Sequence, residues 1–182
     1  MPTPPKKDRR FIILFVYLNL LRILSILSIL LLFSTTLSTM ASDARDLRRE
    51  EDEGEDCEYF PGTQIPTHAW GNFWSELNRT FLLLGLLICL VSETNESTRL
   101  DRSFLQRLLP ILSSGFGTSW VGLLQMAFAC SSLSHLQIGL ALTSSRMTFF
   151  VGLINLLSGW VLGPRGKGLR SILARRRDEA AS

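Results

Sequence analysis

The chain has 182 residues, of which 46% are hydrophobic and 19% are charged, and its formal net charge is +3. The charged share is below that of an average globular domain, and the charged residues lie almost entirely outside four apolar stretches. Few residues remain from which a large soluble core could be built. The composition therefore excludes a large soluble domain and indicates a single membrane domain.

The four apolar stretches predict an all-α fold, an integral membrane four-helix bundle. About 20 apolar residues cross the hydrocarbon core of a bilayer as a helix, so these stretches provide three or four crossings. We expect spans at about 23–41, 77–92, 116–133 and 142–162, within a membrane domain over 23–163.

The first apolar stretch, from Ile12 to Ala41, is too long for one upright crossing. Arg22 interrupts it, and an arginine at the cytoplasmic boundary can extend its guanidinium group to the lipid headgroups. We therefore expect residues 1–22 to form a basic N-terminus with an interfacial lead-in. A cleavable signal peptide is the alternative, because small residues follow the stretch. Its apolar part is longer than the roughly 7 to 15 residues typical of such leaders.

Lysine and arginine residues set the expected orientation, because positively charged flanks are retained in the cytoplasm. They are concentrated in the N-terminus, in the loop between the second and third spans, and in the tail 164–182. We therefore expect both termini in the cytoplasm and the connection 42–76 on the outer side. Tryptophans, which favour the interface between lipid and water, lie near the matching ends of the spans at Trp70, Trp74, Trp120 and Trp160.

The outer connection contains an acidic block at 50–58, which we expect to be solvated and partly disordered because like charges repel. The block lacks the spaced ligands of a calcium-binding loop. A metal site formed by Cys57, His68 and His135 is a second possibility, but their spacing matches no compact ligand pattern. We therefore expect neither a metal nor a cofactor.

Polar residues in or beside the apolar stretches are the candidate functional residues. Glu76 and Arg79 form either an ordinary polar helix start or the lining of a cavity for an ion or small polar solute. Gln125 and Asn155 lie inside the third and fourth spans, where we expect them to form hydrogen bonds across the bundle. The full set of candidate intramembrane polar contacts is Arg22, Glu76, Asn78, Arg79, Gln125 and Asn155.

Small residues recur in the third and fourth spans. Thr118 and Gly122 are four residues apart in one, and Gly152 and Gly159 lie in the other. Such residues allow two helices to approach closely. We expect them to serve packing within the bundle rather than a dedicated dimer face.

The C-terminal tail carries basic residues around a short apolar face. We expect it to contact an anionic cytoplasmic leaflet, because each basic residue near such a surface contributes about 1 kcal/mol of binding. A plain flank that stops translocation is the alternative. The candidate lipid-contact residues are Arg170, Arg175, Arg176 and Arg177.

Short patterns distributed in order along the chain support a resemblance to a known family. They are Asn19 and Arg22, Cys57 to Tyr59, Gly62-Thr63, Ile65-Pro66, Phe73-Trp74, Leu77-Asn78-Arg79, Ser92-Glu93, Leu109 to Leu112, Phe116-Gly117, Gln125, Ser134-His135 and Asn155. With these, the chain resembles a family of small fungal four-span membrane proteins with an uncharacterised domain, over most of its length after Asn19. The resemblance implies a four-span protein with no assigned activity. The dense acidic run and Arg146, near the start of the fourth span, depart from what is expected of the family.

No catalytic set is visible in the sequence. It has no glycine-rich phosphate loop, no metalloprotease helix motif and no serine elbow. We therefore expect no enzymatic activity and no nucleic-acid partner, since the basic residues have no folded platform. The leading interpretation is a tetraspan interaction or membrane-organising protein, whose partners are the lipid bilayer and a membrane protein or a second copy of the chain. The alternative is a small channel or transporter subunit with a polar path through the bundle.

Overall fold

The structure is a computed structural model that describes residues 9–47, 65, 70–95, 118–135 and 139–163. These ranges contain four α-helices and no strand, which confirms the predicted all-α class for the part described. The helices are α1 (Arg9–Leu47), α2 (Gly71–Asn95), α4 (Ser119–Leu133) and α5 (Leu140–Leu162).

Several predictions from the sequence concern residues outside the described ranges. They are the acidic block, the two alternative metal ligands Cys57 and His68, and the tail with its candidate lipid-contact arginines. The structure does not test them.

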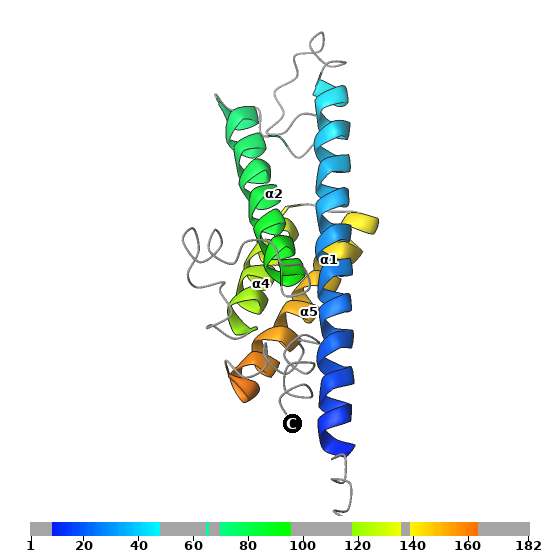
Figure 1. Ribbon diagram of the computed structural model, residues 1–182. Helices are drawn as coiled ribbons and strands as arrows, with labels where there is room; N and C mark the ends of the chain where they lie inside the picture. The colour runs from blue at the N-terminus through cyan, green and yellow to red at the C-terminus, as the bar shows by residue number, and fades with distance from the viewer. Residues whose placement is uncertain (1–8, 48–64, 66–69, 96–117, 136–138, 164–182) are drawn as a thin grey trace, which may run out of the picture.

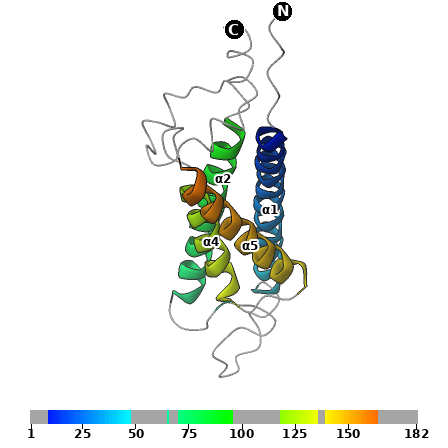
Figure 2. The same cartoon turned by 90° about the horizontal axis from the view of Figure 1, so that it is seen from below.

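The four helices form a ring in which each packs against two others (Figure 1). α1 packs on α2 and α5, and α4 packs on the same two helices from the opposite side. Neighbouring helices run antiparallel. In the pair of α1 and α5, for example, Tyr17 near the start of α1 meets Ser158 near the end of α5, and Thr35 meets Ser144. α5 crosses the bundle obliquely with respect to α1 (Figure 2).

Three of the helices are long and apolar enough to cross a membrane, as expected of an integral membrane protein. They are α1, α2 and α5, whereas α4, with 15 residues, is a shorter apolar helix. Large apolar side chains cover their outward faces, including Leu30 on α1, Leu84 on α2 and Leu157 on α5. In a bilayer these faces would lie against lipid, where apolar exposure carries no penalty.

The first helix does not break at Arg22. α1 continues for 39 residues from Arg9 to Leu47, a length of about 58 Å. It therefore extends through the expected lead-in and beyond the expected end of the first span at Ala41. Intrahelical hydrogen bonds satisfy the backbone on both sides of an arginine, so a charge alone gives a helix no reason to end.

Apolar packing is concentrated where α1 meets α2. Ile29 and Leu32 of α1 are buried together with Leu82, Leu86 and Cys89 of α2. The predominantly apolar composition of this contact fits a helix pair joined by close packing along its centre.

The contact between α4 and α5 depends on glycines. A Cβ atom added at Gly122 would lie 2.5 Å from the backbone nitrogen of Leu156 and 2.6 Å from the carbonyl oxygen of Gly152. A Cβ atom at Gly159 would lie 2.3 Å from the backbone nitrogen of Ser119. Backbone atoms cannot rotate away as side chains do, so any larger residue forces the two helices apart.

We predict that Gly122→Ala destabilises the protein. Alanine is the better helix former by about 1 kcal/mol, but the clash with the α5 backbone should outweigh this gain and cost about 1–3 kcal/mol. Thermal unfolding of the purified protein in detergent measures the difference. Ala127→Val, on the exposed face of α4, is the control and should change the melting temperature little. A melting temperature for Gly122→Ala equal to or above that of the wild type would contradict the close contact.

Candidate functional site: polar contacts inside the bundle

The centre of the bundle holds a cluster of three polar side chains from three helices. Gln125 of α4 donates from Nε2 to Ser25 Oγ of α1 at 2.7 Å. Asn155 of α5 donates from Nδ2 to Gln125 Oε1 at 2.9 Å and to Ser25 Oγ at 3.2 Å. All three side chains are fully buried. The cluster therefore joins α1, α4 and α5 at one point.

Further hydroxyl groups continue these contacts along the bundle. The Thr148 hydroxyl lies 3.1 Å from the carbonyl oxygen of Ser28, and the Thr35 and Ser144 hydroxyls are 2.9 Å apart. Between α4 and α5, the Ser132 and Ser145 hydroxyls are also 2.9 Å apart. We call the central cluster together with these contacts the polar ladder, whose side chains are Ser25, Thr35, Gln125, Ser132, Ser144, Ser145, Thr148 and Asn155.

The polar ladder is packed, and most of its hydrogen-bonding groups have partners. Ser144, Ser145 and Thr148 are fully buried, and each of their hydroxyls is also within hydrogen-bonding distance of a carbonyl on its own helix. Hydroxyl groups that bond to the preceding turn need no water. Asn155 Oδ1 is buried and has no hydrogen-bond partner in the described part of the chain. The arrangement resembles interhelical packing more closely than the lining of a pore.

A charged cluster lies at one end of the pair α1 and α2. The Arg79 guanidinium group donates to Asp43 Oδ2 at 2.5 Å and to Glu76 Oε1 at 3.1 Å. Arg79 and Asp43 are both buried, whereas Glu76 is partly exposed. A buried ion pair needs close, well-directed contacts to compensate for the lost hydration of both groups. We call Asp43, Glu76 and Arg79 the charged rim.

The end of α4 approaches the charged rim through a histidine. The Asn78 side-chain nitrogen lies 3.4 Å from His135 Nε2. If Asn78 is the donor, this nitrogen of His135 must be unprotonated. Partial burial and then the positive charge of Arg79 lower the pKa of His135 below its usual value of 6.5. The lowered pKa favours a neutral imidazole at neutral pH.

Arg22 makes its contact at the opposite end of α2. Its guanidinium group donates to the carbonyl oxygen of Glu93, through Nε at 3.0 Å and through a terminal nitrogen. Glu93 lies in the last turn of α2, where carbonyl groups lack intrahelical partners and attract positive charge. Arg22 and the charged rim thus connect α1 to α2 at both ends of their contact.

The six candidate residues from the sequence therefore lie at four places in the bundle. Gln125 meets Asn155, Glu76 meets Arg79, and Asn78 meets His135, whereas Arg22 lies apart from the other five at the end of α2. Asp43 and the hydroxyl groups of the polar ladder were not among the candidate residues predicted from the sequence. For the hydroxyls a signal existed, because Ser25, Ser28 and Thr35 follow helical spacing on one face of α1. For Asp43 there was none, since an aspartate at the end of an apolar stretch is ordinary.

The described residues hold no group of three or more histidine, cysteine or acidic side chains that could bind a metal ion. Comparisons of the chain with protein-family models, with curated proteins and with solved structures found no match.

We predict that Asp43→Asn lowers the stability of the protein by about 3 kcal/mol, because it leaves the buried Arg79 charge with only the partly exposed Glu76. Thermal or denaturant unfolding in detergent measures the loss. Asp46→Asn is the matched control, since the side chain of Asp46 is more exposed and, among the described residues, accepts only one long hydrogen bond, from Ser42 at 3.5 Å. Equal effects of the two substitutions would show that the charged rim contributes nothing specific.

We also predict that His135 makes stability depend on pH. Its pKa is lowered in the folded protein, so the unfolded chain binds the proton more readily. The contribution is present above about pH 6.5 and is lost as the pH falls from there through the lowered pKa. The melting temperature of the wild type should therefore fall more between pH 8 and pH 5.5 than that of His135→Gln. Parallel curves for the two proteins would refute the prediction.

Proposed function

We propose that the chain is a four-span integral membrane protein that acts as an interaction or membrane-organising protein. The observation that carries this proposal is the polar ladder. Its side chains, all buried except the partly buried Thr35, bond one helix to another, so the polar groups inside the bundle hold it together instead of lining a path. A rigid bundle of this kind presents its outer faces and its connections to partners.

Charged residues support a placement of α1 across the bilayer. Arg22 and Asp43 flank the apolar segment 23–42, which as a helix is about 30 Å long. This length equals the thickness of the hydrocarbon core. Both charges have partners on α2, so the same two levels would mark the membrane boundaries for that helix.

Exposed aromatic side chains support the same placement. Trp70 and Trp74 are exposed at the start of α2, beside the charged rim, and Trp160 is exposed near the end of α5. Tryptophan favours both membrane interfaces. Together with the distribution of lysine and arginine, this supports cytoplasmic termini and an outer connection between α1 and α2.

The fourth crossing would be made by α4, in spite of its length. Thr118 contacts Asn155, and Ser132 contacts Ser145, so α4 lies antiparallel along α5. A helix packed along a crossing helix occupies the same depth in the membrane. A short crossing of this kind is accommodated by local thinning of the bilayer at modest cost.

The partners we propose are lipid and another membrane protein or a second copy of the chain. The tail is proposed to add contacts with anionic lipid. We propose neither enzymatic activity nor binding of nucleic acid. The resemblance to four-span fungal proteins remains part of this proposal, and several residues that carry it, such as Arg22, Arg79, Gln125 and Asn155, make interhelical contacts.

A small channel or transporter subunit is the second candidate. The observation in its favour is that ladder contacts extend over much of α5, from Ser144 to Asn155. Conduction would require the ladder side chains to separate and admit water. Their mutual bonding makes this the less favoured function.

We predict that purified protein in liposomes gives no flux of ions or small solutes above protein-free vesicles. Thr148→Val tests the alternative, because it removes a buried hydroxyl while keeping the side-chain shape. Thr143→Val, on the exposed face of α5, is its matched control. A flux that Thr148→Val reduces and Thr143→Val leaves unchanged would establish a polar path and refute the organising function.

The interaction arm of the proposal is tested by replacing residues 48–64 with a glycine and serine linker of equal length. We expect crosslinking of the intact protein in membranes to yield one defined complex that this replacement abolishes. A chain that is monomeric and uncomplexed at all expression levels would contradict an organising function.

A further inference from the structure

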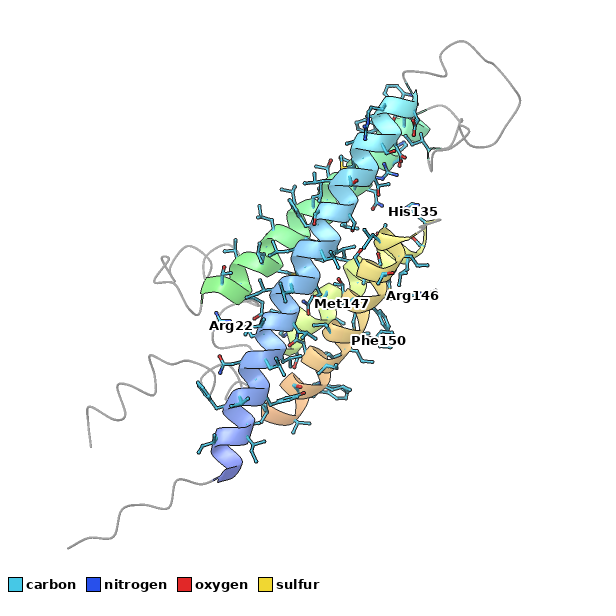
Figure 3. The ribbon with its side chains drawn as sticks, turned by 90° about the vertical axis from the view of Figure 1, so that its right-hand side faces the viewer. Arg22, His135, Arg146, Met147 and Phe150 are labelled. Atoms are coloured by element: carbon cyan, nitrogen blue, oxygen red, sulfur yellow. The ribbon has the colours of Figure 1, made fainter. Side chains whose placement is uncertain are left out.

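Arg146 is a charged residue on an otherwise apolar face of α5, and Figure 3 shows it on the same side of the helix as Phe150. Its side chain is exposed, as are those of Phe150 and Ile154, which follow it at helical spacing. Within the described part of the chain Arg146 makes neither a hydrogen bond nor an ion pair, in contrast to Arg22 and Arg79. The contacts that hold the bundle together therefore do not account for this positive charge.

The contacts of α5 with α1 give the depth of Arg146 in the proposed membrane bundle. The hydroxyl group of Ser144, which precedes it, lies 2.9 Å from that of Thr35. The hydroxyl group of Thr148, which follows it, lies 3.1 Å from the carbonyl oxygen of Ser28. Arg146 therefore lies level with the part of α1 between these two partners, which is the middle of the apolar segment that we place across the bilayer.

An arginine at this depth cannot reach the lipid headgroups. The middle of a hydrocarbon core about 30 Å thick lies about 15 Å from either edge, which exceeds the length of an arginine side chain. Arginines extend to the interface only from positions near the ends of a membrane helix. Deeper in the membrane a charged side chain is costly, and it pairs with another charge or with carbonyl oxygens. Arg146 therefore needs a partner at its own depth.

A second copy of the chain does not provide this partner from its described residues. Their acidic side chains all lie near the ends of α1 and α2, and they are Asp43, Asp46, Glu76 and Glu93. In a symmetric pair of copies joined through this face of α5, the two Arg146 side chains would also lie at the same depth and repel each other. The arginine therefore calls for a carboxylate that belongs to a different protein.

We propose that the face of α5 formed by Arg146, Phe150 and Ile154, which we call the docking face, binds a transmembrane helix of another membrane protein that carries an aspartate or glutamate at mid-depth. A carboxylate binds a guanidinium group through two parallel hydrogen bonds. In a surrounding of low dielectric constant this attraction is much stronger than in water, and the apolar side chains of the docking face pack against the rest of the helix. The inference rests on the proposed function, because it names the class of partner and requires α5 to lie in lipid.

The test measures binding of the purified protein to a designed single-span peptide in phosphatidylcholine vesicles at pH 8. The peptide is a helix of about 20 leucine and alanine residues with one glutamate at its centre, and energy transfer between fluorophores on the protein and the peptide reports binding. We expect it to bind about tenfold more tightly than the same peptide with glutamine, the gain expected for hydrogen bonds to a charged group. A peptide with the glutamate moved beside one end should lose this preference, because the carboxylate no longer lies at the depth of the arginine.

Substitutions of the arginine assign the preference to the docking face. Arg146→Gln should abolish the preference for the glutamate peptide, and Arg146→Lys should retain part of it. Arg146→Glu should instead prefer a peptide with a central arginine, since the charges of the pair are exchanged. Arg45→Gln, which removes an exposed arginine of α1, is the matched control and should keep the preference of the wild type.

Four results would overturn the inference. Equal binding of the glutamate and glutamine peptides would show that the docking face does not recognise a carboxylate. A preference that persists in Arg146→Gln would place the recognition elsewhere, and so would an Arg146→Glu variant that does not prefer the arginine peptide. An oligomer of the wild type in vesicles without peptide that Arg146→Gln dissociates would assign the docking face to a second copy of the chain.

Labelling of a cysteine on the docking face separates these failures from failure of the proposed function. In a protein whose native cysteines are replaced by alanine, Phe150→Cys should be protected from a water-soluble maleimide in vesicles without peptide, and Arg45→Cys should be labelled. Labelling of both at the same rate would show that α5 does not lie in lipid, and the proposed function would fail. Protection of Phe150→Cys together with equal binding of the two peptides would refute the docking face alone.

Discussion

A polar side chain buried among apolar helices has to find its hydrogen bond within the bundle, because neither lipid nor packed hydrocarbon can supply one. The cluster of Ser25, Gln125 and Asn155 meets this constraint by drawing on three helices at once. The constraint gives the bundle its register. Apolar packing alone is tolerant of sliding, but the donors and acceptors of this cluster match in only one alignment of α1, α4 and α5. The glycines between α4 and α5 then allow the close approach that these short contacts require.

Charged side chains attach α2 to the bundle that the polar ladder holds together. α2 takes no part in the central cluster, and it joins the bundle through apolar packing at its centre and arginine contacts at its ends. The two arginines act differently. Arg79 neutralises a buried carboxylate, whereas Arg22 satisfies carbonyl groups at the end of a helix. Arg146 contrasts with both, because its side chain is exposed and makes no hydrogen bond or ion pair with another helix in the described part of the chain.

The sequence was most informative about the existence of the helices and least informative about their ends and partners. Apolar stretches long enough to cross a bilayer identify helices with little ambiguity. The helices extend beyond the predicted spans, since α2 begins at Gly71 and α1 runs from Arg9 through Arg22 to Leu47, whereas the bounds of the spans themselves stay a prediction. Polar residues in such helices, among them Gln125 and Asn155, stand out because burying an unpaired polar group in the membrane costs free energy. Asp43 could not be identified in the same way, because its importance comes from the arginine that the fold brings to it.

The central claim is that interhelical hydrogen bonds, above all the one between Gln125 and Asn155, hold this bundle in register. A double-mutant cycle with Gln125→Leu and Asn155→Leu, followed by unfolding in detergent, tests it most directly because it isolates the interaction between the two side chains. The account predicts a favourable coupling of about 0.5–2 kcal/mol, the range measured for such bonds in membrane helices. Strictly additive effects of the two substitutions would contradict it.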